Sequence, residues 1–194
     1  GFSAAVKAGH DILVKVDGDG QMNPSLIPQF VQPIASGQAD YTKGNRFYLP
    51  ESLHSMPRVR LIGNTALSFL NKAVSGYWNL MDPTNGYLAI DARLFRILPV
   101  QKLSCRYFFE SDLLFRLYTV RAVVKEIPMN SVYLSEKSNL NIMRVLCTFP
   151  WNYLVRFLKR VAYCYFVRDF NVASLQLLLG LALLLFGFYF GLEK

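Results

Sequence analysis

The chain has 194 residues, of which 53% are hydrophobic, and a net charge of +8. This length suffices for one folded domain with a core, and the hydrophobic excess gathers at the C-terminal end. The three cysteines show no metal-ligand spacing and cannot all pair with one another, which argues against a zinc module or a disulfide framework and favours reduced thiols on the cytoplasmic side of a membrane.

The N-terminal part of the chain alternates between helix and strand signals. Residues 1–9 are typical of the end of a helix that stops at a glycine. The apolar run 12–14 predicts a buried strand over 11–16. Apolar positions near the 3.6-residue period predict a helix over 24–35, and a second strand is expected at 39–44.

The same alternation continues through the middle of the chain. The elements expected there are a helix over 59–74, a turn at 82–86, a strand at 87–90, a short helix at 92–98, an amphipathic helix at 109–121, a strand at 122–134 interrupted by Pro128, and a polar loop at 135–141. Alternating strands and helices indicate an α/β layered domain.

The C-terminal end predicts a membrane helix. Residues 172–192 contain no charge, and 21 residues at about 1.5 Å each span the roughly 30 Å hydrocarbon core of a bilayer. The segment before it, 140–171, mixes aromatic residues with five basic ones: Arg144, Arg156, Lys159, Arg160 and Arg168. That mixture predicts an interfacial helical segment on the cytoplasmic side. Nucleic-acid binding is the other interpretation of this mixture, and the adjoining span argues against it.

The sequence after the first strand predicts a metal site. Asp17, Asp19 and Gln21 offer oxygen atoms, which hard divalent cations prefer, and the neighbouring glycines let a bulky anion approach the backbone. Such a metal would most usefully hold a diphosphate. Asp-Gly pairs are also common in ordinary turns. A calcium-binding EF-hand is excluded, because the sixth loop position is Met22 rather than glycine and the twelfth is Pro28 rather than glutamate.

Three further groups of polar residues fall where strands or helices are expected to end. Lys43 and Arg46 suit phosphate oxygens, or else form a solvated basic loop. The turn Asp82-Pro-Thr-Asn-Gly86 offers backbone amides and a hydroxyl to an anion, or is an ordinary turn. Glu110 and Asp112 suit a general base or a neighbour of the metal, and acids at the start of a helix also serve as caps.

These groups occur in an order that resembles family 2 glycosyltransferases. The order is Val-Asp-Gly-Asp-Gly-Gln, Lys-Gly-Asn-Arg-Phe, Asp-Pro-Thr-Asn-Gly-Tyr, Phe-Phe-Glu-Ser-Asp and then a Ser-Asn-Leu loop ahead of the apolar span. The closest branch is the polyprenyl-phosphate sugar transferases, the group of the dolichyl-phosphate mannose synthases. The resemblance covers nearly the whole chain. It implies a partial GT-A fold, which is a Rossmann-like nucleotide-diphospho-sugar transferase domain, over residues 1–139, followed by the interfacial segment 140–171 and the transmembrane helix 172–192.

The resemblance also implies roles for single residues. Asp17 and Asp19 match the Asp-x-Asp motif that binds Mg²⁺ or Mn²⁺ on the sugar nucleotide, and Gln21 matches a third metal ligand. Arg46 matches an arginine that contacts phosphate, with Lys43 beside it.

On the acceptor side, Thr84 and Asn85 lie in the turn that matches the family's Asp-Pro-x-Ser-Gly. Residues Lys137, Ser138 and Asn139 resemble its Ser-Lys-Leu loop; Asn139 replaces the lysine, so the phosphate contact is expected to shift to Lys137. The choice between Glu110 and Asp112 as catalytic base stays open at this point.

The resemblance leads to one main hypothesis for function. A sugar passes from a nucleotide sugar to a polyprenyl phosphate, such as undecaprenyl or dolichyl phosphate, with inversion and with Mg²⁺ or Mn²⁺. The family's N-terminal nucleotide-binding part has no counterpart here, so we expect the chain alone to be inactive.

We expect an integral membrane protein with a cytoplasmic catalytic domain, in a bacterial inner membrane or alternatively the endoplasmic reticulum. We expect no nucleic-acid partner, and homo-oligomerisation is left open. The alternatives are a transferase with a glycan acceptor and a non-catalytic, membrane-tethered partner of such an enzyme.

Overall fold

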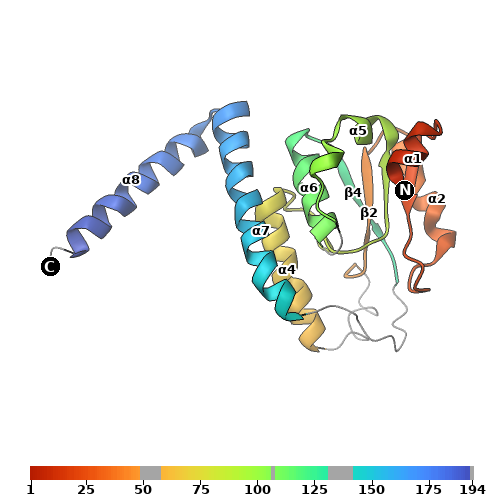
Figure 1. Ribbon diagram of the computed structural model, residues 1–194, viewed down its shortest axis with the longest axis horizontal. Helices are drawn as coiled ribbons and strands as arrows, with labels where there is room; N and C mark the ends of the chain where they lie inside the picture. The colour runs from red at the N-terminus through yellow and green to blue at the C-terminus, as the bar shows by residue number, and fades with distance from the viewer. Residues whose placement is uncertain (49–57, 106–107, 131–141, 193–194) are drawn as a thin grey trace.

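The protein combines one small β-sheet with flanking helices and a long C-terminal helical extension (Figure 1). The computed structural model describes residues 1–48, 58–105, 108–130 and 142–192. The strands are β1 (Ile12–Lys15), β2 (Tyr41–Asn45), β3 (Leu88–Asp91) and β4 (Val124–Pro128). The prediction of an α/β fold is confirmed.

The order of the strands, β1-β3-β2-β4, brings distant parts of the chain together at one edge of the sheet. Strand β3 runs antiparallel to both β1 and β2, whereas β2 and β4 are parallel. Lys15 of β1 and Lys43 of β2 both pair with Leu88, one from each side. The segments that follow β1 and β2 therefore meet the segment that precedes β3.

Helices cover both faces of the sheet and enclose two apolar clusters. Helix α2 (Ile27–Ala35), which follows a 3-10 turn over Pro24–Leu26, covers one face, where Phe30 stacks on Tyr87 with ring centroids 4.0 Å apart. Helix α5 (Ala92–Ile97) and helix α6 (Phe109–Thr119) contribute to the other cluster. The buried residues of that cluster include Leu13, Tyr41, Leu88, Ile90, Phe95, Leu113, Leu114, Leu117 and Val124.

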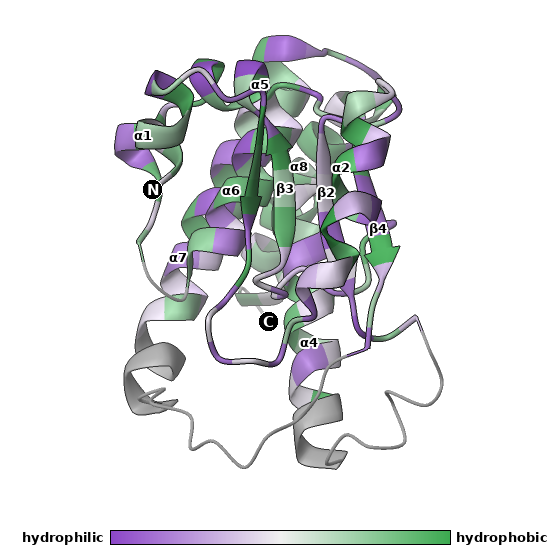
Figure 2. Ribbon diagram, turned by 90° about the vertical axis from the view of Figure 1, so that its right-hand side faces the viewer, coloured by the Kyte–Doolittle hydropathy of each residue, from purple (hydrophilic) through white to green (hydrophobic). Residues whose placement is uncertain are grey.

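The central strand β2 is unusually polar for its position. All five of its residues are buried, among them Thr42, Lys43 and Asn45. Figure 2 shows the contrast, since β3 is green while β2 beside it is pale to purple. Buried polar groups need hydrogen-bond partners, so β2 requires a polar network around it. The prediction of a buried first strand holds only for Leu13, because β1 lies at the edge of the sheet and leaves Ile12 and Val14 partly exposed.

Local signals explain most of the element boundaries. Helix α1 (Phe2–Lys7) ends just before Gly9, whose φ of +87° suits glycine, as expected for a helix that stops there. Strand β4 ends at Pro128, which lacks the N–H needed to extend the ladder. The rest of the strand predicted at 122–134 and the polar loop at 135–141 lie largely outside the described residues.

Two long helices pack beside the sheet domain and a third extends away from it (Figure 1). Helix α4 (Arg58–Ser75) lies along α7 (Ile142–Ala162), where Tyr153 joins an aromatic cluster with Phe108 and Phe149. A π-helical segment (Tyr163–Arg168) links α7 to α8 (Val172–Leu192). Helix α8 is long and apolar enough to cross a membrane, and its most hydrophobic stretch is not buried against the protein. It is therefore a candidate membrane span.

Candidate active site

The loop after β1 touches the turn before β3. A Cβ atom added to Gly86 would overlap a carboxylate oxygen of Asp17, and it would lie 3.0 Å from the ammonium nitrogen of Lys15. Only a glycine lets the backbone come this close to the carboxylate. The two motifs that carry Asp17 and Gly86 are thus in direct contact, as the antiparallel register of β1 and β3 requires.

Lys15 joins two carboxylates at this contact. Its Nζ atom lies 2.9 Å from Asp17 and 3.1 Å from Glu110, which belongs to the first turn of α6. Burial by itself lowers the pKa of Lys15, but the hydrogen bond to Asp17 and the attraction of both carboxylates outweigh it and raise the pKa above its ordinary value. The ammonium group therefore stays charged and holds Glu110 next to Asp17.

Asp112, the other acid of this helix, binds elsewhere. Its side chain is 0% exposed and forms ion pairs with Arg116, at 3.2 Å, and with Arg156 of α7, at 3.0 Å. It also accepts a hydrogen bond from the backbone N–H of Ser104. The structure thus brings Glu110, and not Asp112, to the contact between Asp17 and Gly86.

The loop with Asp19 and Gln21 borders an open hollow of about 670 Å³, which Asp17 and Gln21 line. The backbone N–H of Gln21 donates to the Asp19 carboxylate at 3.0 Å, and Gly20 adopts a φ of +74° in the turn. Two carboxylates and an amide offer the oxygen ligands that a hard divalent cation prefers. Among the residues that the structure describes, no three His, Cys, Asp or Glu side chains cluster as a complete metal site. A cation here would need further oxygen ligands, such as those of a diphosphate.

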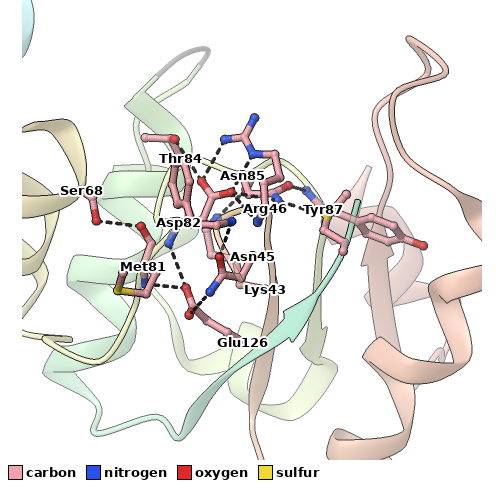
Figure 3. Close-up of polar contacts among 12 residues, drawn as sticks. Lys43, Asn45, Arg46, Ser68, Met81, Asp82, Thr84, Asn85, Tyr87 and Glu126 are labelled. Atoms are coloured by element: carbon pink, nitrogen blue, oxygen red, sulfur yellow. Dashed lines mark hydrogen bonds and ion pairs between the residues drawn. The ribbon is translucent and has the colours of Figure 1, made fainter. Parts of the chain in front are cut away.

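A second network holds the turn 82–86 in place (Figure 3). Arg46 makes a two-pronged ion pair with the fully buried Asp82, at 2.7 and 2.9 Å, and its backbone N–H donates to the same carboxylate. Glu126 of β4 accepts hydrogen bonds from the backbone N–H groups of Met81 and Asp82 and from the side chain of Asn45. Burial raises the pKa of Glu126 above its ordinary value. The turn is thereby tied to both β2 and β4.

Lys43 lies beneath this turn. Its side chain is fully buried, and its ammonium group donates to the backbone carbonyl of Asn85. Burial, which disfavours the charged form, lowers the pKa of Lys43 to about 8. Lys43 therefore supports the turn from inside the protein, and its predicted contact with phosphate stays a prediction.

The remaining predicted residues differ in their surroundings. Asn85 is buried and uses its side chain inside the turn, accepting from the N–H of Tyr87 and donating to Asp82. Thr84 is partly exposed, and its hydroxyl lies 3.5 Å from Asp82. Lys137, Ser138 and Asn139 lie outside the described residues.

Two residues of the site escaped the sequence analysis. Lys15 has the appearance of a solvated lysine at the end of a strand, and Glu126 that of a charge on an edge strand. Their importance follows from partners 95 and 44 residues away in the chain. No local signal in β4, whose sequence Val-Lys-Glu-Ile-Pro does not alternate between polar and apolar residues, singles out Glu126 or identifies its partners.

Known proteins resemble this chain in sequence. It is 30% identical over 159 residues to a UDP-N-acetylglucosamine--dolichyl-phosphate N-acetylglucosaminyltransferase of Methanococcus voltae, in an alignment that covers 82% of this chain and 62% of the relative. It is 28% identical to an undecaprenyl-phosphate mannosyltransferase of Micrococcus luteus, over 68% of this chain and 54% of the relative. A polyprenol monophosphomannose synthase of Mycolicibacterium smegmatis is 24% identical, over 66% and 48%. The chain thus spans about half to two thirds of the length of these relatives, and no family model matches it.

The fold also has counterparts among solved structures. Glucosyl-3-phosphoglycerate synthase from Mycobacterium tuberculosis, in complex with Mn²⁺, uridine diphosphate and glucosyl-3-phosphoglycerate, superposes with a TM-score of 0.55. The match covers 80% of this chain and 52% of that one, with 18% identity. A likeness at this identity shows the fold, which is the GT-A fold expected from the motifs.

Proposed function

From this homology to polyprenyl-phosphate sugar transferases and from the GT-A fold, we propose that the protein transfers a sugar from a nucleotide-sugar donor to a polyprenyl phosphate at a membrane. The observation that carries the proposal is the contact between the Asp-x-Asp loop and the glycine of the turn 82–86. It joins a candidate metal-diphosphate site to a candidate acceptor turn. The relatives named above are all transferases to polyprenyl carriers, which supports the same assignment.

The donor side rests on Asp17, Asp19 and Gln21, which would hold Mg²⁺ or Mn²⁺. A bound divalent cation supplies Lewis-acid stabilisation of the diphosphate leaving group. The Mn²⁺ in the glucosyl-3-phosphoglycerate synthase complex supports a divalent ion in a protein of this fold. Lys15 adds a fixed positive charge beside Asp17, which favours developing negative charge on a departing phosphate.

The acceptor side rests on the turn 82–86 and on Arg46. The ion pair with Asp82 fixes the guanidinium group of Arg46 at the rim of the turn, and we infer that Arg46 and Thr84 orient an anionic acceptor there. A phosphate oxygen is already anionic near neutral pH, so its attack on the anomeric carbon, with inversion, needs no strong base. Lys43 and Asn85 act as positioning residues, because both are buried and engaged within the turn. Helix α8 would keep the site near lipid acceptors, on the cytoplasmic side of a bacterial inner membrane or of the endoplasmic reticulum.

A direct assay tests this function. Membranes that contain the protein, produced from its complete reading frame, receive labelled UDP-N-acetylglucosamine, nucleotide-activated mannose or UDP-glucose, together with polyprenyl phosphate and Mg²⁺ or Mn²⁺. We expect label in the organic phase with one donor. The Asp19→Asn variant should lower it by roughly a hundredfold or more, since several kcal/mol of charge stabilisation depend on the metal.

The matched control for this assay is Asp11→Asn, which makes the same change at an exposed acid before β1. It should retain its activity. Lipid-soluble label that persists in Asp19→Asn would contradict the metal assignment. Folded protein that labels no organic-soluble product with any donor would leave the non-catalytic, membrane-tethered partner or a glycan acceptor instead.

The position of Glu110 supports one second candidate function, which is transfer of the sugar to the hydroxyl of a glycan. A hydroxyl must lose its proton during attack, and Glu110 is a carboxylate that Lys15 holds beside Asp17 in the site. The Glu110→Gln variant distinguishes the two acceptors. For a phosphate acceptor we expect a loss of activity of about tenfold or less, whereas for a hydroxyl acceptor the loss should reach the 10²–10⁴-fold range of general-base catalysis.

A further inference from the structure

A second hollow, basic and separate from the site above, lies between α6, α7 and the π-helical segment. It has a volume of about 740 Å³, and its lining includes Lys102, Arg116, Arg156 and Lys159. With 3.6 residues per turn, Arg116 lies about 120° around α6 from Glu110, on a different face of the helix. The hollow shares no lining residue with the hollows that Lys15 and Asp17 line.

The charges around this hollow do not cancel. Arg116 and Arg156 share one carboxylate, that of Asp112, so the two guanidinium groups keep a net positive charge. Across the described part of the chain, neither Lys102 nor Lys159 takes part in an ion pair, and both side chains are exposed. Four cations against one anion favour an anionic ligand, and guanidinium groups are well suited to the oxygens of phosphate.

The remaining lining is apolar and adjoins the candidate membrane span. Phe115, Tyr163 and Val167 contribute apolar surface, and the segment with Tyr163 and Val167 leads directly into α8. Arg168 anchors this segment by donating to the backbone carbonyls of Tyr118 and Thr119 at the end of α6. In Figure 1, α8 departs from this end of α7. The hollow lies beside the start of the candidate membrane span. Its basic residues suit the head group of an anionic lipid, and its apolar wall suits the start of the lipid's chains.

We propose that this hollow binds the phosphate of an anionic membrane phospholipid. The site differs from the acceptor site of the proposed transfer reaction, because the residues that line it neither line the hollow beside Asp17 nor belong to the turn 82–86. The lipid would neutralise the basic cluster and fix the angle between the sheet domain and the bilayer. The site does not depend on the transferase activity.

Lipid binding to the detergent-solubilised full chain tests the proposal. Native mass spectrometry would count adducts of phosphatidylglycerol, and of phosphatidylcholine with the same acyl chains, over a range of lipid concentrations. We expect saturable binding of one phosphatidylglycerol and weaker binding of phosphatidylcholine. The double variant Lys102→Gln/Lys159→Gln should weaken the binding of phosphatidylglycerol by about thirtyfold, since each lysine near an anionic lipid contributes about 1 kcal/mol and every 1.4 kcal/mol is a factor of ten.

The matched control is Lys7→Gln/Lys125→Gln, which removes the same charge at two exposed lysines on α1 and β4. It should bind phosphatidylglycerol as the parent does. Equal weakening in both double variants, or no preference for phosphatidylglycerol over phosphatidylcholine, would overturn the proposal. Glycerol 3-phosphate that displaces the lipid at comparable concentrations would also overturn it, since the site would then bind soluble phosphates rather than a lipid.

Discussion

Buried charged residues with distant partners organise the site at the scale of single residues. Asp82 is fully buried and paired with Arg46, and Lys43 is fully buried under the same turn. A buried charge without a partner is costly, so each of these groups restricts the positions that the turn can take. Their restraint keeps Gly86 against Asp17.

The low pKa of Lys43 predicts how stability depends on pH. Burial lowers the pKa to about 8, against an ordinary value of 10.5 in the unfolded chain. Between these values the unfolded state binds more protons than the folded state, so the free energy of unfolding rises with pH over that window. The gain should approach roughly 3 kcal/mol by pH 10.5, at about 1.4 kcal/mol per pH unit.

Urea denaturation of the solubilised protein at pH 7.5, 9 and 10 measures this effect. Other lysines and tyrosines titrate in the same range, so the relevant quantity is the difference between the parent and Lys43→Met. The parent should gain stability relative to this variant as the pH rises. Parallel pH profiles of the two proteins would show that folding does not lower the pKa of Lys43.

At the scale of elements, helix α6 links two parts of the molecule. Glu110 at its start reaches β1, while Ser111 and Asp112 reach α7 through Tyr153 and Arg156. Tyr153 also accepts a hydrogen bond from Asn71 of α4. The position of Glu110 in the site therefore depends on how α7 packs.

We expect Asp112→Asn to destabilise the fold. The change leaves Arg116 and Arg156, whose side chains are 12% and 18% exposed, without their shared counter-charge. Breaking a buried ion pair from one side costs about 3 kcal/mol or more. In a chain of this size that lowers the melting temperature by roughly 6–12 °C.

A thermal melt followed by circular dichroism measures this loss. The control is Asp91→Asn at the start of α5, where asparagine still caps the helix and the partner Arg93 is exposed. Its free energy of unfolding should change by no more than about 0.5 kcal/mol. Equal melting temperatures for the parent and Asp112→Asn would mean that Asp112 does not hold α7 in place.

At the scale of the whole molecule, the sheet domain and the C-terminal extension have different surfaces. The sheet domain encloses its apolar residues in two clusters, whereas α8 exposes leucine and phenylalanine along its whole length. Exposed apolar surface of this extent is unfavourable in water and suits a bilayer. Attachment to the membrane is therefore expected to reside in α8.

Removal of residues 172–194 should abolish integral membrane attachment. Membranes from cells that express the chain are extracted with alkaline carbonate, and both fractions are assayed by immunoblot. The parent should stay in the pellet, and the shortened chain should be released. A version of α8 with the same residues in scrambled order should stay in the pellet, because hydropathy rather than sequence order drives insertion. A shortened chain that resists carbonate would place the attachment elsewhere.

Local patterns predicted the elements well for a physical reason. Periodic apolar residues, a glycine after α1 and a proline at the end of β4 act within a few residues, so α1, α2, α6 and α8 lie close to where they were expected. The strand at 87–90 was predicted, but not that it runs antiparallel between β1 and β2. That placement depends on pairing between distant segments, which no local pattern records.

By itself, the sequence determined the α/β class, the apolar character and helical length of residues 172–192 that make them a candidate membrane span, and the order of the polar motifs, because each follows from short-range chemistry or from composition. Only the tertiary structure decided which acids share a site. Glu110 and Asp112 are two residues apart on one helix, yet the packing of α6 between β1 and α7 turns the first toward Lys15 and the second toward Arg156. Side chains at that spacing point in different directions around a helix, so the surroundings on each side assign their roles.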